Sequence, residues 1–344
     1  MFIAENINSA STVNGAFNKF LKNTINLNPT TNAGARTSRD WLVDRLHEFP
    51  QKDSSFPHLY SDMDTFFGSY ARRTKKRPLD DIDMMICLSA DSAWYDEYGD
   101  TLIITAPKTS PHLNKLCFDN TETLNSKKVI NKFISNLYNV PQYDSAEIKR
   151  NQEAATLKLK SYEWNFDIVP CFFTKRDIFG QTFYVIPDGN GNWKKADPRI
   201  DAARVTKINQ QHIGHVLNII RVVKYWNNRP TMPSIPSYML ENMILDYYEH
   251  SRPTKASEFV DIEFQYVISY LSTAIDRAVI DPKKIQGDLN TLDSDTRKKI
   301  SNRCNSDTTI AQQAREYESA NDHRKAIAKW SIIFGDKFPI YTHE

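Results

Sequence analysis

Two acidic residues stand inside an otherwise apolar stretch of the chain, and this stretch constrains the fold more than any other. Asp81 and Asp83 flank Ile82 and precede the run Met84-Met85-Ile86-Cys87-Leu88. A short apolar run of this kind is typical of a buried β-strand. Residues two apart on a strand point to the same face, roughly 6.6 Å apart at a rise of ~3.3 Å per residue. The two carboxylates therefore share one face, while Ile82 and Met84 point into a core.

Neighbouring carboxylates on an apolar strand repel each other and lose hydration. A divalent cation removes both costs, and Mg²⁺ is typically held by one or two carboxylates together with substrate phosphates. Asp167 is a third acid isolated in a strand-like stretch, residues 164–170. Three such acids suit two metal ions ~3.5–4 Å apart that hold the attacking and leaving oxygens of an in-line displacement. We predict that Asp81, Asp83 and Asp167 are catalytic metal ligands, with two Mg²⁺ ions as cofactors and Mn²⁺ as an alternative.

A Gly-Ser pair precedes this strand. Eleven residues separate Ser69 from Asp81. Gly68 lets backbone N–H groups approach a phosphate closely, and a helix that begins at Ser69 would favour an anion at its N-terminus. The residues between them carry a basic run at positions 72–77. This run is either close to an incoming triphosphate or a solvated loop.

The composition excludes several classes of protein. The chain has 344 residues, of which 40% are apolar and 12% aromatic, enough for real cores and too many for a disordered chain. Lys plus Arg is 44 and Asp plus Glu is 42, a net charge of +2, which argues against a protein that mainly coats duplex nucleic acid. No apolar stretch approaches the length of a membrane span, and the N-terminus has no secretory pattern.

Other metal sites are not indicated. The four cysteines are widely spaced, with no C-x-x-C pair, so we interpret them as buried thiols of a cytoplasmic protein. His212 and His215 are three residues apart on a predicted helix, but no third ligand accompanies them.

The predicted secondary structure changes twice along the chain. The first fifty residues have helical spacing, with Thr37 and Ser38 as candidate N-caps. Strand patterns concentrate between about residues 60 and 200, and include a hairpin closed by a turn at residues 187–192. The remainder is almost wholly helical. We therefore predict an α+β fold with an N-terminal core of residues 1–200 and a helical domain of residues 201–344.

A lysine lies on the apolar side of a helix predicted for Ile208–Asn228. At ~100° per residue, Lys224 falls between Ile213 and Leu217 on the helical wheel, inside the apolar arc. Such a lysine either extends its ammonium group to the edge of the arc or contacts an anion. Arg221, one turn earlier, is interpreted as peripheral.

The next predicted helix begins with two polar residues. Ser237 fits an N-cap, a position compatible with a phosphate contact because both use the unpaired N–H groups of the first turn. Tyr238 is either a platform on which a base stacks or a half-buried aromatic residue.

The motifs resemble the signature of the polymerase-β-like nucleotidyltransferase superfamily, in which G-S is followed by D-h-D (h, hydrophobic) and later by h-D-h. The segment Gly68-Ser69-Tyr70-x-Arg72-x-Thr74 is similar to its G-S-Y-x-R-x-T form. Arg73 departs from the family, in which a small residue or glycine is common.

Four later segments narrow the resemblance. Three of them, Phe166–Pro170, Arg221–Asn227 and Pro236–Glu241, are similar to segments of oligoadenylate synthetase and cyclic GMP–AMP synthase. The fourth, Trp330–Pro339, is similar to the C-terminal ending of the bacterial CD-NTases, which are the cyclic oligonucleotide synthases of CBASS antiphage defence.

The resemblance implies a polymerase-β-like core with a mixed sheet and a C-terminal helical domain that closes the nucleotide pocket, with the active site in the cleft of a bilobal molecule. It implies that NTPs, ATP among them, are joined into a cyclic di- or trinucleotide for antiphage signalling, with release of pyrophosphate. A regulatory protein partner and an effector that reads the product are implied as well, whereas nucleic acid is at most regulatory. The residues expected to bind nucleotide are Gly68, Ser69, Arg72, Thr74, Lys224, Ser237 and Tyr238.

Three alternatives remain open. The chain could make linear 2′–5′ oligoadenylate or extend an RNA 3′ end, although no RNA-binding module is visible. It could transfer AMP to a protein. It could also be a non-catalytic sensor, against which the presence of all three acids speaks.

Overall fold

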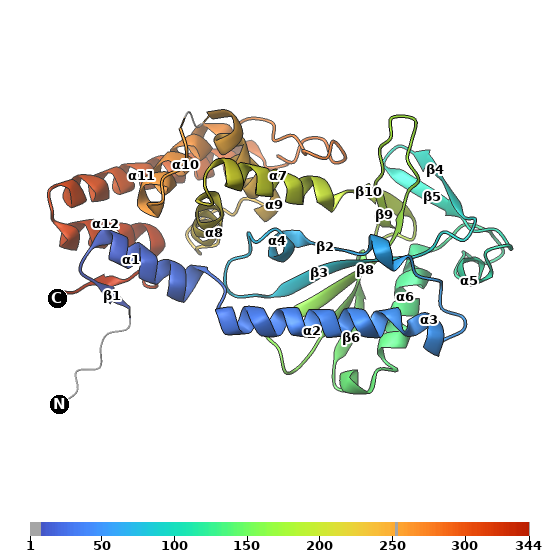
Figure 1. Ribbon diagram of the computed structural model, residues 1–344. Helices are drawn as coiled ribbons and strands as arrows, with labels where there is room; N and C mark the ends of the chain where they lie inside the picture. The colour runs from blue at the N-terminus through green and yellow to red at the C-terminus, as the bar shows by residue number, and fades with distance from the viewer. Residues whose placement is uncertain (1–7, 252–253, 344) are drawn as a thin grey trace. The chain divides into compact units, whose positions relative to one another are not determined.

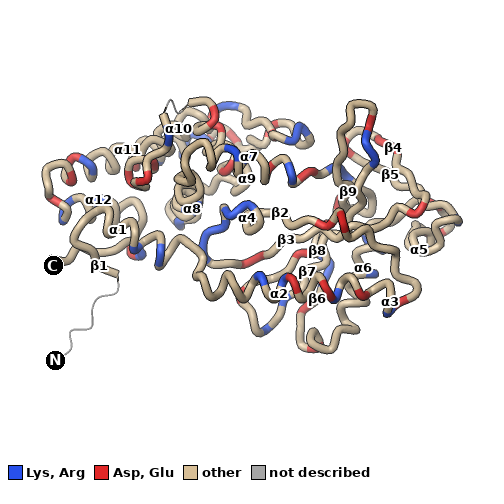
Figure 2. The backbone as a smooth tube through the Cα atoms, in the orientation of Figure 1, with Lys and Arg blue, Asp and Glu red and all other residues tan. Residues whose placement is uncertain are grey.

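The computed structural model describes residues 8–251 and 254–343 (Figure 1), which divide into two compact units. The sheet unit consists of Pro29–Arg72 and Pro78–Ala202. The helical unit consists of the residues up to Asn28, the segment Arg73–Arg77 and the residues from Ala203 onward. Figure 2 shows basic residues gathered in that short segment of chain, between α4 and β3.

The sheet unit is built on a mixed sheet, which confirms the predicted α+β class. Nine strands of the described chain form it, in the order β2-β3-β8-β9-β10-β5-β4, with β7 also paired to β8 and β6 paired to β7. The strands are β2 (Thr65–Phe67), β3 (Asp81–Cys87), β4 (Trp94–Tyr98), β5 (Thr101–Thr105), β6 (Glu147–Asn151), β7 (Ala154–Lys158), β8 (Asn165–Phe173), β9 (Tyr184–Pro187) and β10 (Trp193–Ala196).

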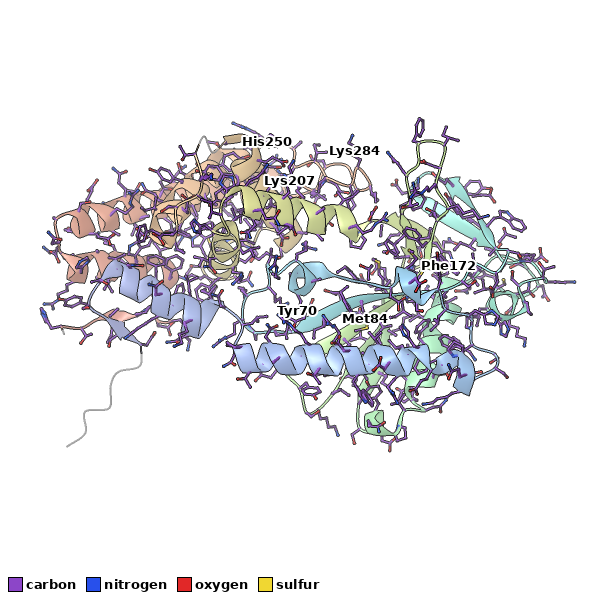
Figure 3. All side chains as sticks on the ribbon, viewed as in Figure 1. Tyr70, Met84, Phe172, Lys207, His250 and Lys284 are labelled. Carbon is purple, nitrogen blue, oxygen red and sulfur yellow. The ribbon has the colours of Figure 1, made fainter. Side chains whose placement is uncertain are left out.

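The parallel pairing of β3 with β8 forms the centre of this sheet. Both strands are rich in buried apolar residues, including Met84 and Phe172, which Figure 3 labels. The remaining pairs are antiparallel, and the predicted hairpin is confirmed because β9 and β10 pair with Trp193 opposite Pro187. The Asp188 carboxylate closes its turn by accepting the N–H groups of residues 190–192.

Helices cover the sheet, and α6 packs against β6, β7 and β8 (Figure 1). The Asn125 side chain caps α6 by accepting the N–H of Lys127 at 2.9 Å. The helices of this unit are α2 (Pro29–His47), α3 (Phe49–Lys52), α4 (Gly68–Ala71), α5 (Pro111–Asn114), α6 (Ser126–Leu137) and the 3₁₀ turns η2 (Ser61–Met63) and η3 (Pro141–Tyr143).

The capping prediction for Thr37 and Ser38 is wrong. Both residues lie inside α2, which begins eight residues before Thr37, at Pro29. Proline is well placed in a first helical turn, where its missing N–H is not needed. The two hydroxyl groups donate back to the carbonyls of Ala33 and Ala35 instead of capping a helix.

The helical unit contains most of the remaining helices and a small parallel sheet. Its helices are α1 (Val13–Phe20), the π-helix η1 (Leu21–Ile25), most of α7 (Pro198–Gln211), α8 (Val216–Asn227), α9 (Ser237–Asp246), the π-helix η4 (Tyr247–Ser251), α10 (Val260–Ala274), α11 (Ser294–Ser319) and α12 (His323–Phe334). The two strands β1 (Ser9–Ala10) and β11 (Ile340–Tyr341) pair the beginning and the end of the described chain.

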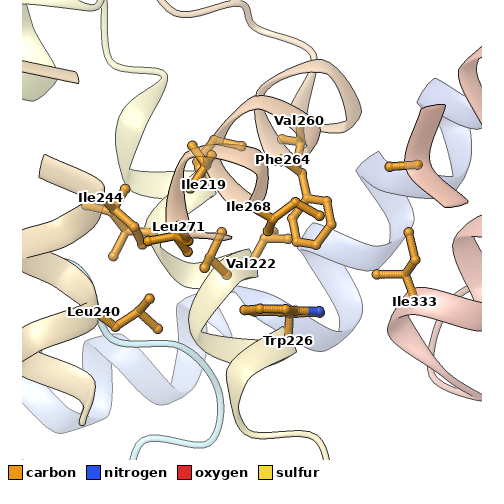
Figure 4. Packing of buried hydrophobic residues seen from close by; sticks show 14 of the residues in the cluster. Ile219, Val222, Trp226, Leu240, Ile244, Val260, Phe264, Ile268, Leu271 and Ile333 are labelled. Atoms are coloured by element: carbon orange, nitrogen blue, oxygen red, sulfur yellow. The ribbon is translucent and has the colours of Figure 1, made fainter. Parts of the chain in front are cut away.

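A large aromatic and aliphatic core holds these helices together (Figure 4). The ring of Phe264 lies 6.2 Å from that of Trp226 and 4.8 Å from that of Phe334, measured between centroids. Phe17 of α1 lies 5.0 Å from Trp330 of α12. Burial of one such side chain contributes about 1.5–3 kcal/mol. The N-terminal helix is therefore part of the core that the C-terminal helices form.

The helix predicted for Ile208–Asn228 is two helices. The chain turns at Ile213 and Gly214, whose φ angles are 58° and 88°. The Gly214 N–H donates to the Asn209 carbonyl, and the Ile213 N–H to that of Gln210, the hydrogen-bond pattern of a Schellman motif. Placing Ile213 in the apolar arc was wrong, because its side chain is 60% exposed at this turn.

None of the described helices combines the length and the apolar character needed to cross a membrane.

Candidate active site

The pairing of β3 with β8 determines where the three predicted acids lie. Asp83 is directly opposite Asp167, and Asp81 is opposite Asn165. Paired residues of neighbouring strands point to the same face, and so do residues two apart on one strand. Asp81, Asp83 and Asp167 therefore share one face of the sheet. Ile82 and Met84 point to the other face and are buried, as the alternation predicts.

The electrostatics of this face suit a cation. Burial raises the pKa of the Asp167 carboxyl, a hydrogen bond from the Thr156 hydroxyl at 2.6 Å lowers it, and the negative charge of Asp81 raises it, with a net increase. The charge of Asp81 is thus close enough to oppose the ionisation of Asp167. Carboxylate oxygens are hard donors, so the residues present fit a divalent cation such as Mg²⁺ or Mn²⁺.

The Gly-Ser turn lies against these acids. Gly68 has a φ angle of +71°, and a Cβ atom at this position would lie 1.8 Å from Asp83 Oδ2. Only glycine fits, because it adopts this backbone conformation without strain and because the Asp83 carboxylate leaves no room for a side chain. Gly68 begins the single turn α4, in which Ser69 is half-buried. Tyr70, labelled in Figure 3, holds the turn to α2 because its hydroxyl donates to Asn32 Oδ1 at 2.7 Å.

Arg72 and Arg73 follow the turn. Arg72 ends α4, where its N–H donates to the Gly68 carbonyl at 3.3 Å. Arg73 has a φ angle of 61°. This left-handed conformation is one that glycine adopts without strain, which accounts for the glycine that the family commonly has at this position.

Lys224 of α8 is paired with a carboxylate of the protein, so its ammonium group does not extend to the edge of the apolar arc. Its ammonium group is buried and lies 2.5 Å from Glu241 Oε2. The same oxygen accepts the Thr74 hydroxyl at 2.8 Å, and Thr74 is fully buried. The structure thus brings Thr74 and Lys224 together around a carboxylate.

Sequence reasoning missed Glu241, although a signal existed. Glu241 lies in α9 beside Asn242, between the apolar stretches 239–240 and 243–245, much as Asp81 and Asp83 stand among apolar residues. In a helix, however, a single acid is ordinarily exposed, so its isolation in the sequence is a weaker signal than it is on a strand.

Ser237 and Tyr238 begin α9. Ser237 is exposed, and the cap position belongs to Pro236, whose side chain makes no capping hydrogen bond. Tyr238 is half-buried, and its hydroxyl donates to Asp281 Oδ1 at 3.0 Å. Lys283 donates to the same hydroxyl, and its Nζ lies 4.2 Å from the centroid of the Tyr238 ring. The sequence singled out neither Asp281 nor Lys283.

Arg221 is not peripheral. Its Nε donates to the Arg73 carbonyl at 3.2 Å, and its Nη1 donates to Asn26 Oδ1. Burial, together with the charge of Arg73, lowers the pKa of Arg221 to about 10. The residue holds the basic segment to the helical unit.

The two histidines do not form a metal pair. His212 Nδ1 accepts the Ala256 N–H at 3.0 Å, and its Nε2 lies 3.1 Å from the Tyr248 carbonyl. His215 contacts the Ala256 carbonyl. All four cysteines are unpaired and buried, as predicted.

One group of three side chains in the described part of the chain has metal-ligand atoms within 4.8 Å of one another. This group consists of Asp246, Glu249 and His250 of α9 and η4. Arg204 already bonds to both acids of the group, at 2.5 Å and 2.9 Å. The group is therefore explained as a surface ion-pair network.

No protein-family model matches the sequence. A protein of Bacillus cereus (strain VD146), described as a probable cyclic nucleotide synthase, is 45% identical over 334 residues, which cover 97% of this chain and 99% of that protein. The chain belongs to the cyclic nucleotide synthase family, the bacterial CD-NTases. It is therefore an enzyme of the nucleotidyltransferase class.

Solved structures share the fold of this CD-NTase. CdnC of E. coli MS115-1 in complex with HORMA-deltaN matches with a TM-score of 0.68 and 15% identity, over 94% of this chain and 97% of that chain. CdnC with ATP matches with a TM-score of 0.67 and 16% identity, over 94% and 98% of the two chains.

Proposed function

We propose that this CD-NTase joins nucleoside triphosphates, ATP among them, into a cyclic di- or trinucleotide and releases pyrophosphate. The observation that carries the proposal is the register that aligns Asp83 with Asp167 and puts Asp81 on the same face. The contact of Gly68 with the Asp83 carboxylate supports it, because a phosphate-binding turn belongs beside the metal ligands. The 45% identical relative and the CdnC structure with ATP support the class of product and substrate.

Asp81, Asp83 and Asp167 are the residues that would hold two divalent ions, Mg²⁺ or Mn²⁺. When bound, such ions neutralise phosphate charge and favour ionisation of the acceptor hydroxyl group. The chain itself orients the reactants. The backbone at Gly68 and the hydroxyl of Ser69 would bind the β- and γ-phosphates, since an oxygen of the tail can approach a residue without a side chain.

Further residues are proposed to bind nucleotide. Lys224 would contact the phosphate tail, with Glu241 and Thr74 fixing its ammonium group. Ser237 and Arg72 would add hydrogen bonds to phosphate, and Tyr238 would stack on a base.

The chemistry is a substitution at phosphorus. The 2′- or 3′-hydroxyl oxygen of one nucleotide bonds to the α-phosphorus of another, and the bond from that phosphorus to the β-phosphate breaks. Pyrophosphate leaves and the hydroxyl proton passes to solvent. Repetition within the linear intermediate closes the ring, and catalysis is mainly positioning and charge stabilisation.

The test is incubation of the protein with all four NTPs and Mg²⁺ or Mn²⁺, followed by mass spectrometry of the small-molecule fraction. We expect a product that phosphatase does not shorten, because a ring has no terminal phosphate. The double variant Asp81→Asn, Asp83→Asn should make none, while its thermal midpoint stays equal to or above that of wild type because repulsion with Asp167 is relieved. Product from the double variant would overturn the assignment of the site.

The same assay separates the alternatives. Linear 2′–5′ oligoadenylate would lose its terminal phosphates to phosphatase. An RNA-extending enzyme would need an added RNA 3′ end. An AMP transferase would put label from ATP on a protein band.

We propose a cytoplasmic role in antiphage signalling, with an effector that reads the product and a regulatory protein partner. The CdnC structure with HORMA-deltaN supports such a partner, and the four unpaired cysteines suit a reducing compartment. If the protein makes the same amount of product with and without the proteins encoded by its neighbouring genes, that result would argue against regulation by a partner.

A further inference from the structure

The basic segment Arg73–Arg77 is held to the helical unit on both sides of its two central lysines. On one side, the Thr74 hydroxyl donates to Glu241 Oε2. On the other, the Arg77 N–H donates to the Ile25 carbonyl at 2.8 Å, and its guanidinium group donates to the carbonyls of Asn26 and Asn23 at 3.0 and 2.7 Å. A cation at the carbonyl end of a helix is favourable. Lys75 and Lys76 therefore lie, half-buried, on a loop that is held at both ends.

Lys224 and Lys76 differ in how their charges are balanced. The Lys224 ammonium group is paired with Glu241 at 2.5 Å. Lys76 Nζ makes one hydrogen bond, to the Arg77 carbonyl at 3.4 Å, and no ion pair with any residue that the structure describes. Lys76 is nevertheless half-buried.

The environment of Lys76 opposes its charge. Burial lowers the pKa of Lys76, and the positive charges of Lys75 and Lys224 lower it further. An ammonium group that is partly dehydrated, beside like charges and without a carboxylate, is costly for the free protein. A polyanion that binds there would remove this cost.

We propose that Lys76 binds the triphosphate of a nucleotide substrate beside Lys224. This inference rests on the proposed function, and adds to it the residue that supplies the unmatched positive charge. Glu241 already neutralises Lys224, whereas a triphosphate tail brings about four negative charges to its site. A lysine suits this task because its ammonium group is a point charge that contacts phosphate from several directions.

The experiment is calorimetric titration of the full chain with inorganic tripolyphosphate. Lys76→Met should weaken binding about tenfold or more, and Lys76→Arg, which keeps the charge, should stay within about threefold of wild type. Lys207→Met is the matched control, since Lys207 is an exposed lysine of α7 in the same unit (Figure 3) and should bind as wild type does. The KM for ATP should rise with the tripolyphosphate Kd.

Thermal unfolding distinguishes binding from a structural role. Removal of an unmatched, half-buried charge should leave the midpoint of Lys76→Met equal to or above that of wild type, whereas loss of a structural contact would lower it. Wild-type affinity of Lys76→Met for tripolyphosphate, or a lowered midpoint together with weaker binding, would overturn the inference. Failure of the proposed function would be seen separately, as absence of cyclic product from the wild-type protein, because the titration needs no turnover.

Discussion

The half-buried acids of the sheet unit and the buried ion pair of the helical unit have opposite electrostatic environments. On the sheet, like charges face the same side of β3 and β8, and Asp81 raises the pKa of Asp167. In the helical unit, Lys224 and Glu241 are paired at 2.5 Å with Thr74 bonded to the same oxygen. On the sheet, the charge of one acid therefore opposes the ionisation of another, whereas in the helical unit a carboxylate of the protein matches the charge of the lysine.

The largest effect is expected when the carboxylate that neutralises the Lys224 charge is removed. Glu241→Ala leaves the buried Lys224 charge uncompensated, so we expect the free energy of unfolding to fall by about 3–5 kcal/mol. The double variant Glu241→Leu, Lys224→Met should recover much of that stability without recovering activity. Urea denaturation of the three proteins measures both effects, and wild-type stability of Glu241→Ala would show that the pair is not needed.

Gly68→Ala tests how closely the turn approaches the acids. The added Cβ would overlap Asp83 Oδ2 at 1.8 Å, so the turn or the carboxylate must shift. We expect product formation to fall about a hundredfold, the size of effect that a displacement of about 1 Å can have on catalysis.

Gly99→Ala is the control for backbone strain. Gly99 has a similar φ angle of +63°, and nothing lies within 4 Å of its added Cβ. Both variants should lose about 1–2 kcal/mol of stability from the left-handed backbone, but Gly99→Ala should keep its activity. Equal activities would mean that the contact with Asp83 has no role.

The repulsion between Asp81 and Asp167 predicts that the stability of the protein depends on pH. The pKa of Asp167 is raised in the folded protein, so its ionisation costs stability, and this cost appears as pH rises from the ordinary Asp value through the folded pKa. In metal-free buffer, Asp167→Asn should therefore stabilise the protein at pH 7, with a gain that disappears in acid. Thermal midpoints across pH measure this.

Asp53→Asn should behave in the opposite way. Hydrogen bonds from Lys132 and Ser55 hold the pKa of the Asp53 carboxyl well below its usual range. The stability that they contribute is present above the ordinary Asp pKa and is lost as pH falls through the folded pKa. Asn at this position should therefore destabilise the protein at pH 7. The same sign for both variants would contradict the electrostatic explanation.

The smallest expected effect concerns Arg73. Its φ angle of 61° is strained for any residue but glycine. Arg73→Gly should gain about 0.5 kcal/mol, because relief of strain is partly offset by the greater freedom of glycine in the unfolded chain. Activity should change less than about twofold, and a large loss would show that the arginine side chain itself is needed.

Several features of the fold that depend on local sequence patterns were predicted correctly. Alternation of polar and apolar residues located β3 and the common face of Asp81 and Asp83, and turn residues located the β9–β10 hairpin. The same local reasoning could not reveal the break at Ile213, where a Schellman motif interrupts a continuous apolar pattern.

Contacts between residues far apart in the sequence could not be predicted from local patterns either. Glu241 lies 167 residues from Thr74, and α1 shares a core with α12 more than 300 residues away. Contacts of this kind depend on the whole fold rather than on the periodicity of one segment, so the assignment of α1 to the helical unit could not be predicted.

The helical unit takes its core from both ends of the chain, with Phe17 against Trp330 and β1 paired with β11. During synthesis on the ribosome, the sheet unit is complete before the last helices emerge, whereas α1 first meets its partners in α8 and α10 and completes its native contacts only when α12 has been made. The N-terminal helix is therefore exposed to chaperones and proteases for most of translation, and the second half of the molecule folds last.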